Sequence, residues 1–206
     1  MAIVYPLPIP TARTARKVKI RKSSVVGMTV SPFTKGQEVF AHLGEGWEMD
    51  VDLPPMGRAD AEQWIALQLA LNGLEGTFLM GDPATKTPRG NPVGVPVVDG
   101  AGQNRFKTLA TRGWTPNASG VLLKGDWIQL GSAGTSVLYK SLADVDADAT
   151  GKAVIDVRSR IKGDLTDGEG VITSNCVGVW RMVSDTEWDV DEALIYGLNF
   201  SAIEAQ

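Results

Sequence analysis

The stretch Gly46–Asp82, GWEMDVDLPPMGRADAEQWIALQLALNGLEGTFLMGD, decides the fold, because it encodes a strand, a helix and a second strand in succession. Apolar residues alternate with acids over Trp47–Leu53, which is the two-residue period of a half-buried strand. Pro54 and Pro55 end this strand, because proline has no backbone N–H to donate to a sheet.

A helix is predicted next, over Ala59–Asn72. Asp60 lies near its start, where a carboxylate favours the positive end of the helix dipole. Its apolar residues form one stripe at helical spacing: Ala61, Trp64, Ile65, Leu67 and Leu71. Asn72-Gly73 provides a left-handed exit, and Thr77–Met80 follows as a short strand. No other helix signal in the chain is as clear, so the sequence predicts one substantial helix in a protein otherwise built of strands.

Outward from this stretch, the N-terminal part also reads as strands. The first fifteen residues carry three prolines and favour an extended segment. Alternation predicts a strand over Lys17–Val30, a turn over Ser31–Gly36 and a second strand over Gln37–Leu43. Gly44–Gly46 is predicted to turn that strand into the one that begins at Trp47.

The sequence texture changes after Asp82. Residues 82–104 are rich in proline and glycine, and short strands with turns spaced about ten residues apart follow, which is typical of a small barrel or sandwich. The last strands, from Cys176 onward, are expected to complete the sheet that the helix covers. We therefore predict a mainly β protein in which residues 1–82 and 174–206 form a β-sandwich with one flanking helix, and residues 83–173 form an inserted all-β domain.

Composition bounds the function. The 206 residues are 43% hydrophobic and 21% charged, with a net charge of −4, so nothing indicates a strong preference for nucleic acid or membrane. Cys176 is the only cysteine, which excludes an intrachain disulfide and a cysteine zinc cluster. The first residues have neither a basic lead nor an unbroken apolar run, so we expect no signal peptide and no membrane insertion.

Charge is distributed unevenly along the chain. Residues 1–35 contain bases and no acid, and residues 182–206 contain acids and no base. Both ends can be solvated edges, or they can meet, within one subunit or between neighbours. The candidate interface residues are Arg16, Lys17, Lys19, Arg21, Asp185, Glu187, Asp189 and Asp191.

No motif indicates catalysis. Asp144, Asp146 and Asp148 have the spacing of the first calcium-loop ligands, but Ala149 and Ile155 stand where the loop needs glycine and glutamate. His42 is the only histidine, and the chain lacks a nucleophile elbow, a phosphate loop and a dinucleotide fingerprint. We expect no enzyme activity, no metal site and no cofactor.

Three aromatic residues of the predicted insert are candidates for contact with a sugar or a partner surface: Trp114, Trp127 and Tyr139. Aromatic rings among Gly and Asn residues can stack on such surfaces when they are exposed. Packing in the core of the insert is the alternative.

Several stretches resemble the distal tail proteins of long-tailed phages. They are WEMDVDLPPM (47–56), RADAEQWIALQLALNGLEGTFLMGDP (58–83), GAGQNRFKTLATRGWTPNASGVLLKGDWIQLG (100–131), LYKSLADVDADATGKAVIDVRSRI (138–161) and YGLNFSAIEA (196–205). The resemblance spans nearly the whole chain and includes no catalytic motif.

This resemblance implies a tail-tube-like β-sandwich and a structural role in the virion. The expected assembly is a homo-hexameric ring at the tail tip, or baseplate, formed in the host cytoplasm. Its expected partners are the tail tube protein and the tail-tip hub and tape-measure proteins, with DNA passing through the lumen without specific binding. The alternatives are a host-receptor or carbohydrate-binding module of the tail tip, and a hydrolase, for which no residue argues.

Overall fold

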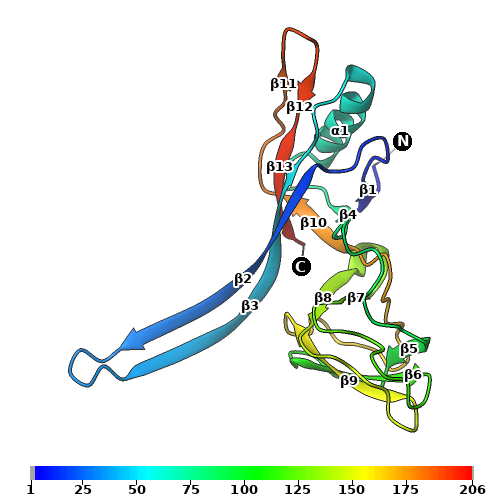
Figure 1. Cartoon of the computed structure of the whole chain (residues 1–206). Coiled ribbons are helices and arrows are strands. Elements are labelled where there is room, and N and C mark those ends of the chain that lie inside the picture. Colours follow the sequence, from blue (N-terminus) through cyan, green and yellow to red (C-terminus); the bar gives the residue numbers. More distant parts are fainter. Residues whose placement is uncertain (1–2, 206) are drawn as a thin grey trace.

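A computed structural model describes residues 3–205 of the chain (Figure 1). The expected mainly β class with one α-helix is confirmed. A six-stranded sheet with its helix, a second β unit and a long projecting hairpin make up the molecule (Figure 1). The β-rich parts therefore divide into a body that holds the helix, a compact unit below it, and an extension that leaves the body.

The six-stranded sheet takes its strands from both ends of the chain, in the order β1-β4-β10-β13-β3-β2. Their bounds are β1 (Leu7–Pro8), β2 (Lys17–Val30), β3 (Gln37–Asp52), β4 (Phe78–Met80), β10 (Gly178–Met182) and β13 (Asn199–Glu204). A separate pair, β11 (Asp189–Val190) and β12 (Tyr196–Gly197), forms a small hairpin between β10 and β13. Strand β2 is one edge of the sheet and the proline-flanked β1 is the other.

Helix α1 (Arg58–Leu71) covers one face of this sheet. It ends at Asn72, which adopts the left-handed conformation (φ 49°) and donates its N–H to the Leu69 carbonyl, as the Asn-Gly pair predicts. The Trp64 ring lies 6.2 Å from that of Phe200, which in turn meets Phe78 edge-on at 5.8 Å. The predicted apolar stripe is thus the face that closes the core.

Residues 94–172 contain a second sheet with its own core, in the order β5-β6-β9-β8-β7. Its strands are β5 (Gly94–Val98), β6 (Thr108–Trp114), β7 (Trp127–Leu130), β8 (Val137–Ser141) and β9 (Lys152–Arg158), with a short 3-10 turn at Ala133–Thr135. The segment 170–172 bridges to Val97 on one edge strand and to Gln129 on the other. This segment closes the sheet into a small barrel, so that neither edge strand is left open there.

The two units share a packed junction. The Trp47 and Trp127 rings meet edge-on with centroids 4.9 Å apart, and the Trp47 Nε1–H donates to the Leu138 carbonyl at 3.1 Å. Trp127 and Leu138, from the barrel, belong to the core of the helix-bearing body. The barrel is therefore fixed to the body by buried aromatic contacts and not by a flexible linker alone.

The predicted turn at Gly44–Gly46 is wrong. Strand β3 runs without a break from Gln37 to Asp52, pairs with β2 along most of its length, and absorbs an irregularity near Ser24 and Val26. Glycine has no side chain to pack, so it can sit in a strand where the backbone bulges. The consequence is a continuous hairpin that leaves the body, visible at the lower left of Figure 1.

Candidate interaction surface

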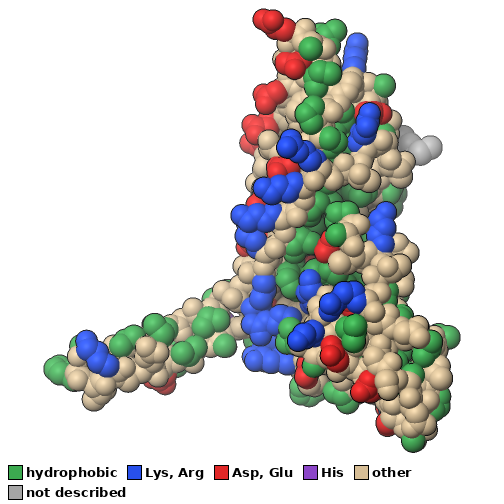
Figure 2. All heavy atoms as spheres, in the orientation of Figure 1, with side chains coloured by type: hydrophobic (Ala, Val, Ile, Leu, Met, Phe, Trp, Pro, Cys, Tyr) green, Lys and Arg blue, Asp and Glu red, His purple; other side chains and the backbone are tan. Residues whose placement is uncertain are grey.

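The outer part of the β2–β3 hairpin is an exposed arm, which we define as residues 25–44. Every residue of this segment except Ser31 is exposed in the described chain. Eight of them are large and apolar: Val25, Val26, Met28, Val30, Phe33, Val39, Phe40 and Leu43. Figure 2 shows these hydrophobic side chains along much of the arm. Sequence alternation predicted the strands but not that both would lie outside the body.

One face of the arm continues the core face of the sheet. In the body, Val18 pairs with Val51 and Ile20 with Met49, and these side chains point toward the core. The irregularity spans two residues on β2 (24 to 26) and four on β3 (45 to 41). Because both numbers are even, the alternation keeps its phase. The same face of the arm therefore presents Val26, Met28, Val30, Val39 and Ala41.

An apolar face of this kind is unfavourable when it is exposed to water. A two-stranded hairpin alone is marginally stable in water, and exposed apolar patches of this kind mark interaction sites. The apolar side chains of the arm belong to neither core of the described chain, and only Leu43, at the base of the arm, lines a hollow with barrel residues such as Arg105 and Ile161. The arm is thus a largely uncovered apolar surface in the described part of the chain.

The opposite face of the sheet is charged. Strand register places Lys17 opposite Asp52, Lys19 opposite Asp50, and Arg21 opposite Glu48. The Arg21 guanidinium lies 2.5 Å from Asp50 and 3.5 Å from Glu48. The hydrogen bond from Ser201 at 2.9 Å, with that from Arg21, lowers the pKa of Asp50. Opposite charges facing each other across strands stabilise the pairing.

Three of the four basic candidates, Lys17, Lys19 and Arg21, therefore lie opposite acids of their own subunit. The sequence alone does not show this pairing, because the acids of β3 lie outside the first thirty-five residues. Arg16, just before β2, donates its backbone N–H to the Asp52 carbonyl at 2.9 Å. The acidic candidates Asp185, Glu187, Asp189 and Asp191 lie on or beside the exposed β11–β12 hairpin. No ion pair joins the two sets within the described chain. In Figure 2 acidic and basic side chains follow one another down the left side of the body, with the acids above the bases.

All three aromatic candidates for sugar contact are buried. Trp114 and Tyr139 lie in the barrel core, and Trp127 lies in the junction with the body. Burial raises the pKa of Tyr139 to about 12, and its hydroxyl accepts the Lys162 N–H at 2.9 Å. These rings have no free face to stack on a sugar, so the core-packing alternative holds for each.

The acids with calcium-like spacing serve the backbone instead. Asp144 accepts the Lys124 N–H, Asp146 the Gly120 N–H, and Asp148 the N–H groups of Thr150 and Lys152. Across residues 3–205, no group of three or more His, Cys, Asp or Glu residues could hold a metal ion. His42 is exposed on the arm.

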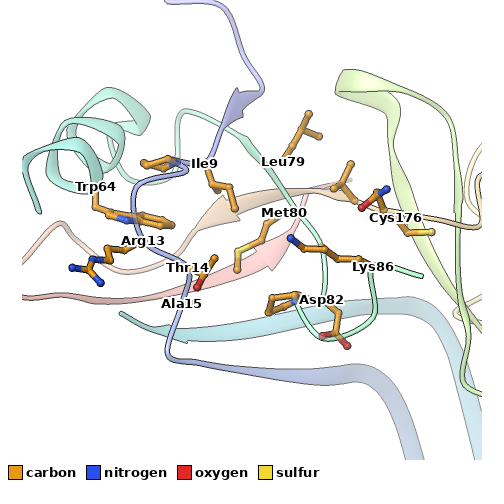
Figure 3. Close-up of a pocket in the computed structure, with 15 residues that line it drawn as sticks. Ile9, Arg13, Thr14, Ala15, Trp64, Leu79, Met80, Asp82, Lys86 and Cys176 are labelled. Carbon is orange, nitrogen blue, oxygen red and sulfur yellow. The ribbon is translucent and has the colours of Figure 1, made fainter. Parts of the chain in front are cut away.

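Beside α1 the body carries a hollow of about 200 Å³, and Figure 3 shows the residues that line it. It is lined by the N-terminal segment, α1, the end of β4 and the segment before β10, including Ile9, Ala15, Trp64, Leu79, Met80 and Val177. Its rim carries Asp82 and Lys86. Four sequence-distant segments build it, so no local pattern could have revealed it.

No protein-family model matches this chain, and no curated protein matches it either. Within residues 3–205, none of the helices is long and apolar enough to cross a membrane.

Proposed function

We propose that this protein is a structural subunit of a phage tail, a homo-hexameric ring at the distal end of the tail tube. The observation that carries the proposal is the arm, whose apolar face extends the core face of the sheet and is left uncovered. A ring formed by head-to-tail contacts gives each arm one neighbour and leaves no arm unsatisfied. The resemblance of the sequence to distal tail proteins supports the same role.

The charged face of the sheet suits the lumen of such a ring. Binding of DNA to protein is dominated by cations that neutralise phosphates. The bases on this face, Lys17, Lys19 and Arg21, each lie opposite an acid of β3. DNA passing along this face would meet neutralised charges and slide without being held. In the assembled tail the ring would contact the tail tube protein on one side, and the hub and tape-measure proteins on the other.

The three aromatic side chains that suggested a receptor- or carbohydrate-binding role are buried, so they do not support that role. The proposal therefore rests on assembly and not on ligand binding.

The test is the oligomeric state of the purified full chain. Native mass spectrometry and negative-stain electron microscopy should show closed six-fold rings. Met28→Glu, which puts a charge on the apolar face of the arm, should shift the chain to monomers. Val154→Glu is the matched control, because Val154 is 64% exposed on β9 and Met28 is 59% exposed on the arm. A chain that stays monomeric at all concentrations, or a Met28→Glu variant that assembles as the wild type does, would refute the proposal.

Charge reversal at Lys17 and Lys19 tests the predicted electrostatic interface separately. If these residues bind an acidic edge of the neighbour, their change to Glu should weaken the rings. If they only pair with Asp50 and Asp52 across the strands, the folding stability of the chain should fall and ring formation by the folded fraction should persist.

A further inference from the structure

The tip of the arm presents a single aromatic ring. Phe33 is 94% exposed, the highest fraction among the large apolar side chains of the described chain. Its turn is tightly bonded: the Ser31 N–H donates to the Gly36 carbonyl and the Lys35 N–H to the Ser31 carbonyl, both at 2.9 Å. The Thr34 hydroxyl also accepts the Gly36 N–H at 3.3 Å. A defined turn holds the ring outward, which lowers the entropy lost when it binds.

The hollow beside α1 has the properties of a receptor for such a ring. Its lining is mainly apolar, and its volume of about 200 Å³ is large enough for one aromatic side chain. The Trp64 ring extends into it from α1 toward the N-terminal segment (Figure 3).

Trp64, which lines the hollow, carries an unused hydrogen-bond donor. Trp64 is 1% exposed, and its Nε1–H has no hydrogen-bond partner within residues 3–205. A buried donor without an acceptor is destabilising, so the site favours a ligand that brings an acceptor next to an apolar group. A turn backbone does both, since its carbonyl groups lie next to the side chain it presents.

Each charge near the tip has a charge of opposite sign available at the hollow. The arm carries Lys35 in the tip and Glu38 at the start of β3, and the rim of the hollow carries Asp82 and Lys86. Asp82 is held in place by the Ala84 N–H at 3.0 Å and the Trp127 Nε1–H at 3.3 Å. Opposite charges placed at the rim of an apolar contact orient the partner.

The tip and the hollow face different neighbours. The arm points away from the body on one side, and the N-terminal segment, α1 and β4 lie on the other (Figure 1). The arm's share of β3, Gln37–Gly44, reaches about 27 Å at about 3.4 Å per residue. A projecting apolar group on one side and a pocket on the other make a head-to-tail contact, which closes into a ring when the rotation allows it.

We propose that Phe33 at the tip of each arm inserts into the hollow of the next copy of this chain, between Trp64 and the N-terminal segment. The inference rests on the proposed ring and names the contact that closes it. The Trp64 Nε1–H donates to a backbone carbonyl of the inserted tip, and Lys35 and Glu38 lie near Asp82 and Lys86 of the neighbour.

Engineered disulfides in the full chain test the contact. In a Cys176→Ala background, Phe33→Cys is combined with Ala15→Cys, which lines the hollow. Mild oxidation should join neighbouring chains into a ladder that ends at the closed ring on a non-reducing gel. The matched control combines Phe33→Cys with Val154→Cys, an exposed barrel residue, and should give no ladder.

A second variant measures how much the ring contributes. Phe33→Ala should raise the protein concentration needed for half-assembly at least about tenfold, because a buried aromatic anchor carries much of an interface. Val154→Ala, at an exposed position on β9 of the barrel, should leave it unchanged.

Three results overturn the inference, and they separate it from the proposed function. The tip contact is refuted, and the ring is left in place, if rings form while the double variant Phe33→Cys with Ala15→Cys gives no disulfide. The same holds if Phe33→Ala assembles as the wild type does. A wild-type chain that forms no rings refutes both.

Discussion

The ammonium of Lys162 lies 2.6 Å from a carboxylate oxygen of Glu204, and the pair joins the segment after the barrel strands to the last strand of the body. The same oxygen accepts the Trp47 N–H at 3.1 Å. The Glu204 side chain is 2% exposed. Burial raises the pKa of Glu204 above its ordinary value, although Lys162 and the Trp47 N–H act in the opposite direction. The junction thus contains a buried charge that depends on one partner.

Removing that partner should destabilise the fold in a pH-dependent way. Lys162→Met leaves Glu204 buried without a countercharge, which should lower the free energy of unfolding by about 3 kcal/mol at pH 7. The pKa of Glu in the unfolded chain is about 4.3. Below that pH the carboxyl group is protonated in both states, so a raised folded pKa costs no folding stability. The penalty grows as pH rises between the two pKa values. Urea unfolding should therefore show a small deficit at pH 4 and the full deficit at pH 7.

The double variant Lys162→Met with Glu204→Gln is the control, because it removes both charges and keeps an acceptor for the Trp47 N–H. It should recover most of the loss at pH 7. A single variant whose deficit is the same at both pH values would show that Lys162 acts through packing and not through charge.

Acid should weaken ion pairs that stabilise the barrel. Hydrogen bonds from Arg112 lower the pKa of Asp167 to about 2, and Lys152 and Arg112 lower that of Asp99. Carboxyl groups with lowered folded pKa values stabilise the protein above the unfolded pKa, near about 3.9. That contribution is lost as pH falls from about 4 toward 2.

Asp167→Asn should therefore flatten the acid limb of the thermal stability curve, as followed by the fluorescence of the buried tryptophans. Asp156→Asn, which changes an exposed carboxylate on β9, should leave that limb unchanged. Identical acid limbs for the wild type and Asp167→Asn would show that the Arg112 contact adds nothing measurable in solution.

Local patterns gave the strands and the helix of the body because burial there follows chain periodicity. Trp47–Leu53 alternates as its sheet requires, and Ala61–Leu71 repeats at helical spacing. The exposure of the arm could not be predicted from the sequence. Alternation of apolar and polar residues shows that the two faces of a strand differ, but not whether another element covers the apolar face. Val26 and Met28 have the same pattern as Val18 and Ile20, yet only the latter pair meets a core.

Contacts between distant residues account for the rest. The pairing of Lys17 with Asp52 depends on strand register, so the basic stretch looked like a free edge until the register was known. Trp114 and Trp127 lie among turn residues, where sequence cannot distinguish a buried ring from an exposed one. The hollow beside α1 could not be predicted from the sequence, because the segments that line it come together only in the folded chain.

The Cys176 thiol should be inert in the native protein. Burial raises its pKa to about 12, and its sulfur lies 3.5 Å from the Trp127 carbonyl and 3.4 Å from the Ile172 carbonyl. The thiolate is the reactive form, so a disulfide reagent at pH 8 should label the wild type only after denaturation. Ser174→Cys, which adds an exposed thiol two residues away, should react at once. Rapid labelling of the wild type would show that the segment before β10 opens in solution.

Gln68 is a stability defect in the buried face of α1. The side chain is 1% exposed, and neither its carbonyl oxygen nor its amide nitrogen has a hydrogen-bond partner within residues 3–205. It lines a small void together with apolar side chains, among them Met182 and Phe200, which offer no side-chain hydrogen-bonding group to an amide. Leaving a buried amide unsatisfied costs about 1–3 kcal/mol, whereas an apolar side chain of the same shape has no such cost.

Gln68→Met, which keeps the length of the side chain, should therefore raise the free energy of unfolding by about 1 kcal/mol and the melting temperature by about 2–4 °C. Gln63→Met is the matched control, since Gln63 lies on the exposed face of the same helix, and it should change neither quantity by a measurable amount. Denaturant and thermal unfolding of both variants decide the matter. A loss of stability in Gln68→Met alone would mean that the amide is satisfied in solution, by water held between α1 and the sheet.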